Sequence, residues 1–406
     1  MAQKGHEPNA NGQRILGFDG LRAIAFLAVF VSHKVPNGRL EAVGTTGVWL
    51  FFVLSGFLIT RILASNRENI EQRSATFSSS LGNFYLRRTA RILPVYYAFL
   101  GIITLLVWGD HIYAGTSGRQ IANWLFVTNI YVEQHGWETD LGHLWSLAVE
   151  EQFYLSFAPL ALLVPRRRLG ALCVGLVIFS VVAHVWLWLN GASLVVFDAS
   201  SLTNLGLLAL GGWAGLNADR SLPRFLLSGA AVAANVVTIF VLPFLLARTG
   251  LWPVVGRLSG FLMVLLLLQV FQNQRGSAVL ILDAGWVREI GLVSYGAYLF
   301  HPVIHAQALL GYFAIEVALP RAFLIAIEFM LTLALAELSW RLFERPIQHF
   351  LRRSGRESRN LTSAELDQAD LRPAADNSKQ TSNLVSKDTV AAWSARSPEG
   401  DRADHV

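Results

Sequence analysis

Residues 16–35 read LGFDGLRAIAFLAVFVSHKV, an apolar stretch long enough to cross a lipid bilayer as a helix. It contains two ionisable side chains, Arg22 and His33, with ten residues between them. At about 1.5 Å per residue they lie roughly 16 Å apart, one towards each half of the membrane. A charge at the bilayer centre costs about 2.5–3.5 kcal/mol on insertion scales. Either the two residues mark the ends of a path through the membrane, or Arg22 snorkels to the headgroups and His33 caps the far interface.

The composition of the whole chain indicates a polytopic membrane protein. Of its 406 residues, 53% are hydrophobic and 15% are charged, and the mean hydropathy is +0.44. Soluble domains are about 25% charged. The net charge of +5 suits arginine-rich cytoplasmic loops and not nucleic-acid binding, because no soluble basic domain is visible. The single cysteine, Cys173, rules out an intrachain disulfide.

Ten segments are apolar and long enough to span a bilayer. They are 16–36, 44–63, 92–109, 143–164, 169–189, 201–217, 225–247, 252–272, 290–313 and 320–342. A further apolar run at 121–131 is too short to cross, so we expect it to enter and leave on the same outer side. The sequence therefore predicts an all-α bundle of about ten transmembrane helices.

Positive charge orients this bundle with both termini in the cytoplasm. Arginines gather in the loops 61–91 and 166–168 and just after the last span, whereas 131–142 has no lysine or arginine. Arg248 is the one discordant charge. We divide the chain into a cytoplasmic N-terminal segment (1–13), a membrane domain (14–350) and a polar cytoplasmic tail (351–406) that we expect to be disordered.

Acid–base chemistry would lie near the outer ends of the first and fourth spans. Glu150 and Glu151, in HLWSLAVEEQFYL, fall two turns inside the outer end of the fourth span. Adjacent carboxylates on one helix point about 100° apart, so at most one readily faces His33. A histidine with a carboxylate partner can act as a general base. Alternatively, either glutamate pairs with an arginine such as Arg22 or Arg88.

Two arginines lie where the third span leaves the cytoplasm, in NFYLRRTARILPVYY. Arg88 and Arg91 are three residues apart and hence share one helix face. Two guanidiniums so placed can bind a pyrophosphate or a 3′-phosphate. Ordinary anchoring by the positive-inside rule is the alternative.

The ninth span, SYGAYLFHPVIHAQ, carries Tyr295, Tyr298, His301 and His305. The two histidines are one turn apart, a spacing that can hold a metal ion. Because no acidic or cysteine partner lies nearby in the sequence, we expect a polar cavity here and no metal.

Two other motifs are interpreted as structural. Ser55-Gly56 in the second span indicates a close helix contact and not a nucleophile, because no G-x-S-x-G elbow surrounds it. The segment ELSWRLFERPI offers pairs four residues apart that would close the inner end of the last span, formed by Glu337, Arg341, Glu344 and Arg345.

Together these segments resemble the acyltransferase-3 family of integral-membrane O-acyltransferases over about residues 14–350. Six segments carry the resemblance, in the family's order: FDGLRAIAFLAVFVSH, GVWLFFVLSGFLIT, FYLRRTARILPVYY, HLWSLAVEEQFYL, SYGAYLFHP and ELSWRLFERPI. The resemblance implies transfer of an acyl group, usually acetyl, from acyl-coenzyme A in the cytoplasm to a hydroxyl, usually on a glycan at the outer face. The family's ten spans, with both ends in the cytoplasm, agree with the topology that the charges predict.

The resemblance also implies roles for individual residues. His33 would be the catalytic base, Arg22 an essential residue lining the path, and Arg88 and Arg91 the ligands of the coenzyme A phosphates. To the catalytic set we add Glu150 and Glu151, and we expect Trp49, Tyr295 and His301 to bind the acceptor. Trp49 departs from the family, many of whose members have Asp or another polar residue there. A tryptophan would narrow the acceptor site or make it more apolar.

We therefore expect an enzyme of the bacterial inner membrane that uses acetyl-coenzyme A, or another acyl-coenzyme A, as co-substrate. Its acceptor would be a hydroxyl of an extracytoplasmic or lipid-linked glycan, and we expect no nucleic-acid partner. Two alternatives stay open. One is acylation of a small secreted metabolite such as a macrolide, and the other is a transporter or flippase that moves a lipid-linked sugar along the same polar path without chemistry.

Overall fold

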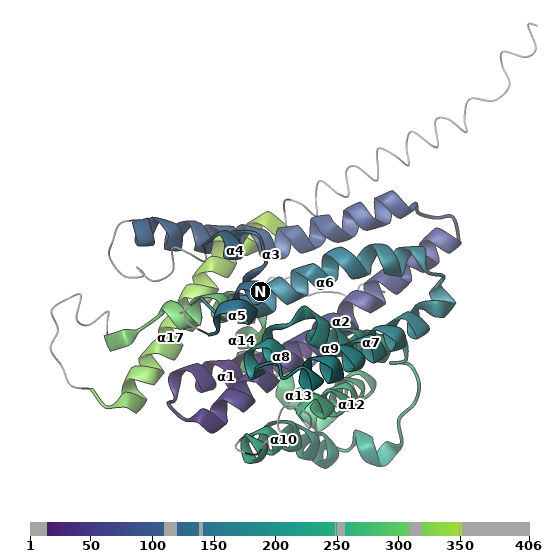
Figure 1. Ribbon diagram of the computed structural model, residues 1–406. Helices are drawn as coiled ribbons and strands as arrows, with labels where there is room; N and C mark the ends of the chain where they lie inside the picture. The colour runs from purple at the N-terminus through teal and green to yellow at the C-terminus, as the bar shows by residue number, and fades with distance from the viewer. Residues whose placement is uncertain are drawn as a thin grey trace, which may run out of the picture. The chain divides into compact units, whose positions relative to one another are not determined.

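The computed structural model describes residues 14–108, 120–137, 141–247, 249, 256–307, 319–348 and 350. These residues form helices and short helical turns with no β-strand among them, which confirms the predicted all-α class (Figure 1). The predicted N-terminal segment (1–13) and tail (351–406) lie outside the described residues.

Most of the predicted spans correspond to single helices. The first four are α1 (Phe18–Lys34), α2 (Gly38–Glu71), α3 (Phe77–Trp108) and α6 (Leu144–Leu163). The next four are α7 (Leu169–Leu189), α9 (Ser201–Leu216), α10 (Gly229–Leu246) and α12 (Ser259–Gln272), and the last is α17 (Arg321–Ser339). Shorter pieces connect them, among them α8 (Leu194–Ala199), α13 (Ser277–Leu282) and 3₁₀ turns at Arg166–Arg168, Arg224–Leu227 and Gly256–Leu258.

Within the described residues, five helical stretches have the length and hydropathy of membrane spans. They are Gly38–Glu71, Arg166–Leu189, Leu194–Leu216, Gly229–Leu246 and Arg321–Gln348. The number of about ten spans, and the placement of both termini in the cytoplasm, stay predictions.

The short apolar run at 121–131 forms two small helices, α4 (Gln120–Trp124) and α5 (Thr128–His135). They are separated at Phe126, whose φ of 53° lies in the left-handed region and ends the first helix. The Gln152 side chain on α6 donates to the carbonyl of Phe126 at 2.9 Å. Neither helix is long enough to cross a bilayer, in line with the prediction that this run does not span it.

The prediction of one continuous helix over 290–313 is wrong. The segment breaks into α14 (Gly285–Leu292) and α15 (Ser294–Phe300), followed by a 3₁₀ turn over His301–Val303 and an extended Ile304. Pro302 ends the helical hydrogen bonding because its nitrogen has no hydrogen to donate. Residues 308–318 lie outside the described part of the chain.

Helix α2 lies at the centre of the bundle and packs against α1, α3, α6, α9, α10 and α12 (Figure 1). Glycines let α2 and α9 approach closely. A Cβ on Gly56 would collide with the backbone of Leu208, and one on Gly211 would collide with the backbone of Val53. The close helix contact predicted at Ser55-Gly56 is therefore confirmed for Gly56.

Candidate active site

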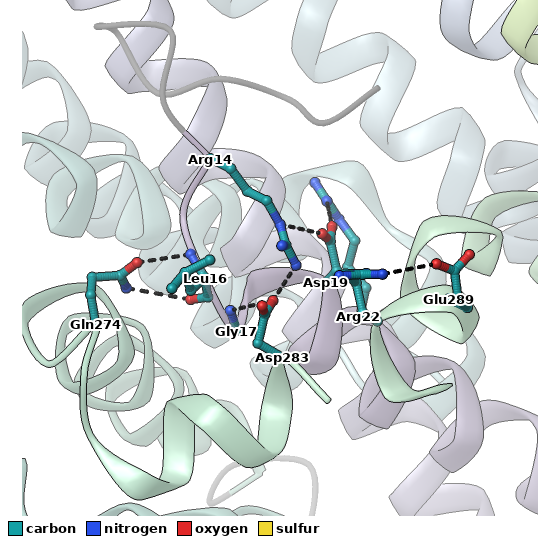
Figure 2. Close-up of polar contacts among 9 residues, drawn as sticks. Arg14, Leu16, Gly17, Asp19, Arg22, Gln274, Asp283 and Glu289 are labelled. Carbon is teal, nitrogen blue, oxygen red and sulfur yellow. Dashed lines mark hydrogen bonds and ion pairs between the residues drawn. The ribbon is translucent and has the colours of Figure 1, made fainter. Parts of the chain in front are cut away.

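Arg22 and His33 lie on the same helix, α1, as predicted. At its N-terminal end, Arg22 pairs with Asp19 at 3.1 Å. Figure 2 shows that Asp19 also faces Arg14, at 3.5 Å, and that Arg14 forms an ion pair with Asp283, the residue that follows α13. The Asp19 carboxylate thus partly offsets the charge of Arg22, which lowers the cost of keeping it in an apolar bundle.

A small cavity lies within the bundle beside α1. The residues that line it are Arg22, Val48, Phe51, Phe52, Ser55, Leu58, Arg88, Arg91, Ile92, Ser146, Leu147, Glu150, Tyr154, Ser294, Tyr295 and Tyr298. It leaves about 80 Å³ of space for water-sized molecules. The cavity extends along α6 from Ser146 to Tyr154, or roughly 12 Å for eight residues of helix.

The two arginines of the third span share a face, as their spacing predicts. Arg88 and Arg91 both line the cavity. Their neighbour Arg87 does not line it and is exposed. The Arg88 guanidinium lies over the Tyr154 ring, 5.6 Å from its centroid. The cavity therefore has a cationic end formed by Arg22, Arg88 and Arg91.

Glu150 and Glu151 point in different directions, as expected of neighbours on a helix. Glu150 lines the cavity and accepts hydrogen bonds from Ser55 at 2.8 Å and Tyr154 at 3.0 Å. Glu151 has one buried carboxylate oxygen without a hydrogen-bond partner among the described residues. Neither glutamate bonds to His33, so the expected histidine–carboxylate pair does not form.

His33 contacts another histidine instead. Its Nδ1 lies 2.8 Å from Nε2 of His301, and the two rings stack 12° from parallel with centroids 5.0 Å apart. His301 is fully buried, and its Nδ1 lies 2.7 Å from the carbonyl oxygen of Tyr298. His33 itself is exposed at the last turn of α1 and does not line the cavity.

Tyr298 links the cavity to the histidines. Its hydroxyl lies 2.6 Å from Ser146 Oγ and donates to the carbonyl of His143 at 2.9 Å. Its ring centroid lies 5.6 Å from that of His301 and 5.5 Å from that of His143. We call His33, His143 and His301 the histidine cluster. Tyr298 thus stands between this cluster and the end of the cavity opposite the arginines.

A buried ion pair fixes the chain beside the histidine cluster. Lys34 Nζ lies 3.1 Å from Glu328 on α17, and both side chains are only 4% exposed. Lys34 also donates to the carbonyl of Ile304 at 2.6 Å, and Glu328 accepts from the backbone of Ala306 at 3.0 Å. The pair thereby ties the end of α1 to α17 and to the loop that follows His301.

Two of the predicted acceptor-binding residues have structural contacts. Trp49 is buried and packs under Arg257, whose guanidinium lies 4.6 Å from the centroid of its ring. Trp49 does not line the cavity, whereas its neighbours Val48, Phe51 and Phe52 on α2 do. Tyr295 lines the cavity and donates to the carbonyl of Ile92 at 3.2 Å. His301, the third of them, is buried within the histidine cluster.

No group of three or more potential metal ligands occurs in the part of the chain that the structure describes. His305 does not lie one helical turn from His301, because Pro302 has already ended the helix, and its side chain is exposed. In the last motif, Arg341 pairs with Glu337 at 2.6 Å as predicted. Glu344 is instead buried in a π-helical turn and accepts from Ser339 at 3.1 Å.

Sequence reasoning missed several residues of this region. His143, Ser146, Lys34 and Glu328 were given no role in the site, and Tyr298 was named only as part of the polar ninth span. Glu328 carried a readable signal, because an acid in the middle of an apolar span needs a partner. The partner, Lys34, lies almost three hundred positions earlier, and no local pattern pairs the two.

Comparison with known families agrees with this architecture. The chain matches the family described as acyltransferase domain (Acyl_transf_3) over residues 15–336, and it belongs to that family. Family membership and the apolar helices together identify an integral membrane protein with an acyltransferase domain of this family.

Individual relatives are similar over most of the chain. Peptidoglycan O-acetyltransferase OatA of Listeria monocytogenes is 30% identical over 358 residues, which cover 81% of this chain and 55% of OatA. YrhL of Bacillus subtilis, provisionally named a peptidoglycan O-acetyltransferase, is 31% identical over 376 residues, covering 82% of this chain and 55% of YrhL. The chain thus spans about half the length of the curated relatives it matches. No solved structure matches it.

The ion pair between Lys34 and Glu328 gives a stability prediction. Lys34→Met or Glu328→Gln alone should lower the free energy of unfolding by about 3–5 kcal/mol, because each leaves the charge of the other residue buried without its partner. The double variant Lys34→Met/Glu328→Gln should lose less than the sum of the two. Thermal unfolding of the purified protein in detergent measures all three.

The matched control is Glu337→Gln, which removes an exposed ion pair with Arg341 and should change stability by less than about 1 kcal/mol. Additive losses in the double variant would show that Lys34 and Glu328 do not depend on each other.

Proposed function

We propose that this protein transfers an acyl group, acetyl in the first instance, from acyl-coenzyme A to a hydroxyl of an extracytoplasmic or lipid-linked glycan. One observation carries the proposal: a single cavity is lined at one end by Arg22, Arg88 and Arg91 and at the other by Ser146 and Tyr298, beside the histidine cluster. A cationic end suits the phosphates of the donor, and a histidine end suits acid–base chemistry on a hydroxyl.

At the donor end, Arg88 and Arg91 would bind the phosphates of coenzyme A. Both are half-buried, which strengthens an ionic contact relative to bulk water. Arg22 would lie along the pantetheine arm, on the route towards Tyr298. Glu150, held by Ser55 and Tyr154, would balance the positive charge when no donor is bound.

At the acceptor end, His33 would act as the general base. It takes the proton of the acceptor hydroxyl as the hydroxyl oxygen attacks the thioester carbonyl carbon. The carbon–sulfur bond then breaks, the acyl group stays on the acceptor oxygen, and the coenzyme A thiolate leaves. The protonated His33 returns the proton to the thiolate, so the products are an ester and free coenzyme A.

The cavity must widen for this reaction. Ligand pockets commonly measure about 300–1,000 Å³, whereas this cavity leaves about 80 Å³ for water-sized molecules. Tyr298 also separates the cavity from His33. We infer that donor binding moves the side chains around Tyr298 and joins the cavity to the histidine cluster.

The acceptor is proposed from the relatives. OatA is a peptidoglycan O-acetyltransferase by name, so a sugar hydroxyl of peptidoglycan is the first acceptor to test. The positive-inside topology would place the arginines at the cytoplasmic boundary, with residues 1–13 and 351–406 on that side, in a bacterial inner membrane. His33 would then lie towards the outer face, where such an acceptor is found.

The donor end generates a binding prediction. Arg88→Ala and Arg91→Ala should each weaken coenzyme A binding about 10- to 150-fold, the equivalent of a charge-assisted contact of about 1.5–3 kcal/mol. Arg87→Ala is the matched control, because Arg87 is exposed outside the cavity and should leave affinity unchanged. Isothermal titration of each variant with coenzyme A and with dephospho-coenzyme A measures these affinities. Equal affinity in all three variants would return these arginines to membrane anchoring.

The acceptor end generates a catalytic prediction. His33→Ala should reduce acetyl transfer at least about 100-fold, because general-base catalysis contributes about 10²–10⁴-fold, while coenzyme A affinity stays near wild type. His305→Ala, which removes an exposed histidine outside the cluster, is the control. The assay is release of free thiol and acetylation of soluble peptidoglycan fragments by purified protein. Transfer within threefold of wild type in His33→Ala would exclude His33 as the base, and no thiol release by wild type would favour a transporter.

A further inference from the structure

The hydrogen bonds around His301 fix where its protons lie. A carbonyl oxygen can only accept, so the 2.7 Å contact with Tyr298 O requires His301 Nδ1 to carry the hydrogen. The Tyr298 carbonyl is available because the residue four positions later is Pro302, which has no backbone N–H to donate to it. The sequence His-Pro at the end of α15 thus creates this contact.

The other nitrogen of His301 must then accept. His301 is fully buried, and its ring lies among Phe26 and Phe30, with centroids 6.1 and 6.3 Å away. A second proton would place a positive charge in this apolar setting, close to the Lys34 ammonium, which Glu328 already neutralises. A neutral His301 with its hydrogen on Nδ1 presents a lone pair at Nε2.

This arrangement determines the state of His33. Its Nδ1 lies 2.8 Å from that lone pair, so Nδ1 of His33 donates the hydrogen. A neutral His33 therefore carries its lone pair on Nε2, to which no described residue forms a hydrogen bond. His33 is exposed as a residue, as an incoming hydroxyl that reached Nε2 would require.

We propose that His301 is a positioning residue that holds His33 in the tautomer with a hydrogen on Nδ1 and a basic Nε2. The inference rests on the proposed function, in which His33 is the base. When Nε2 takes the acceptor proton, the Nδ1–H bond to His301 persists and stabilises the imidazolium. A neutral histidine thus fills the place that a carboxylate often takes beside a catalytic histidine.

Two substitutions separate hydrogen bonding from packing. Glutamine has an amide oxygen and nitrogen joined through one carbon, as the two ring nitrogens of histidine are. In His301→Gln the amide nitrogen can donate to Tyr298 O while the oxygen accepts from His33. In His301→Phe the ring contacts with Phe26 and Phe30 remain, but both hydrogen bonds are lost.

We expect His301→Gln to keep kcat for acetyl transfer within about tenfold of wild type and His301→Phe to lose about 100-fold or more, with KM for acetyl-coenzyme A unchanged in both. A packing role predicts the opposite order. If His301→Phe equals or exceeds His301→Gln, the inference is overturned. The proposed function fails by a different result, which is acetyl transfer near the wild-type rate in His33→Ala.

Nitrogen NMR of wild-type protein labelled with ¹⁵N-histidine tests the tautomer without depending on variant folding. The His33 resonances are identified by their loss in His33→Ala. We expect a protonated Nδ1 and an unprotonated Nε2 at neutral pH. A hydrogen on Nε2 of His33 would contradict the assignment even if both His301 variants lose activity.

Discussion

An ionisable side chain cannot stay inside an apolar helical bundle unless other groups of the protein pair with it or accept its hydrogens, and this constraint organises the site. Arg22 faces Asp19, Lys34 faces Glu328, and the buried His301 faces His33. The ion pairs also fix the parts of the chain on either side of the site. The Lys34–Glu328 pair holds the loop after His301, and the Asp19 network holds the N-terminal end of α1.

The two ends of α1 thereby acquire different chemistry. The Arg22 end opens on a cavity with two more arginines from α3, whereas the His33 end meets a buried histidine from α15. Tyr298 lies between them, with its hydroxyl facing Ser146 at the end of the cavity and its carbonyl binding His301. One residue therefore contacts both the cavity and His301, the histidine that bonds to the proposed base His33.

Local features of this arrangement were predictable because they depend on helix geometry alone. The common helix of Arg22 and His33, the shared face of Arg88 and Arg91, and the divergence of Glu150 and Glu151 all follow from 3.6 residues per turn. The partner of His33 was not predictable, because His301 lies more than 250 positions away in the sequence. The break at Val293 was not predicted either. Pro302 did carry a signal for the second break, since proline cannot continue a helix.

The central claim, that donor and acceptor meet from opposite sides of the membrane, is tested most directly in inverted membrane vesicles whose cytoplasmic face is outward. Labelled acetyl-coenzyme A is supplied outside, and soluble peptidoglycan fragments are enclosed in the lumen. Transfer of label to the enclosed fragments by wild-type protein, and its loss in His33→Ala, is the result that the cavity and its two ends predict. Label that appears only when the fragments share the outer compartment with the donor would contradict a path through the bundle.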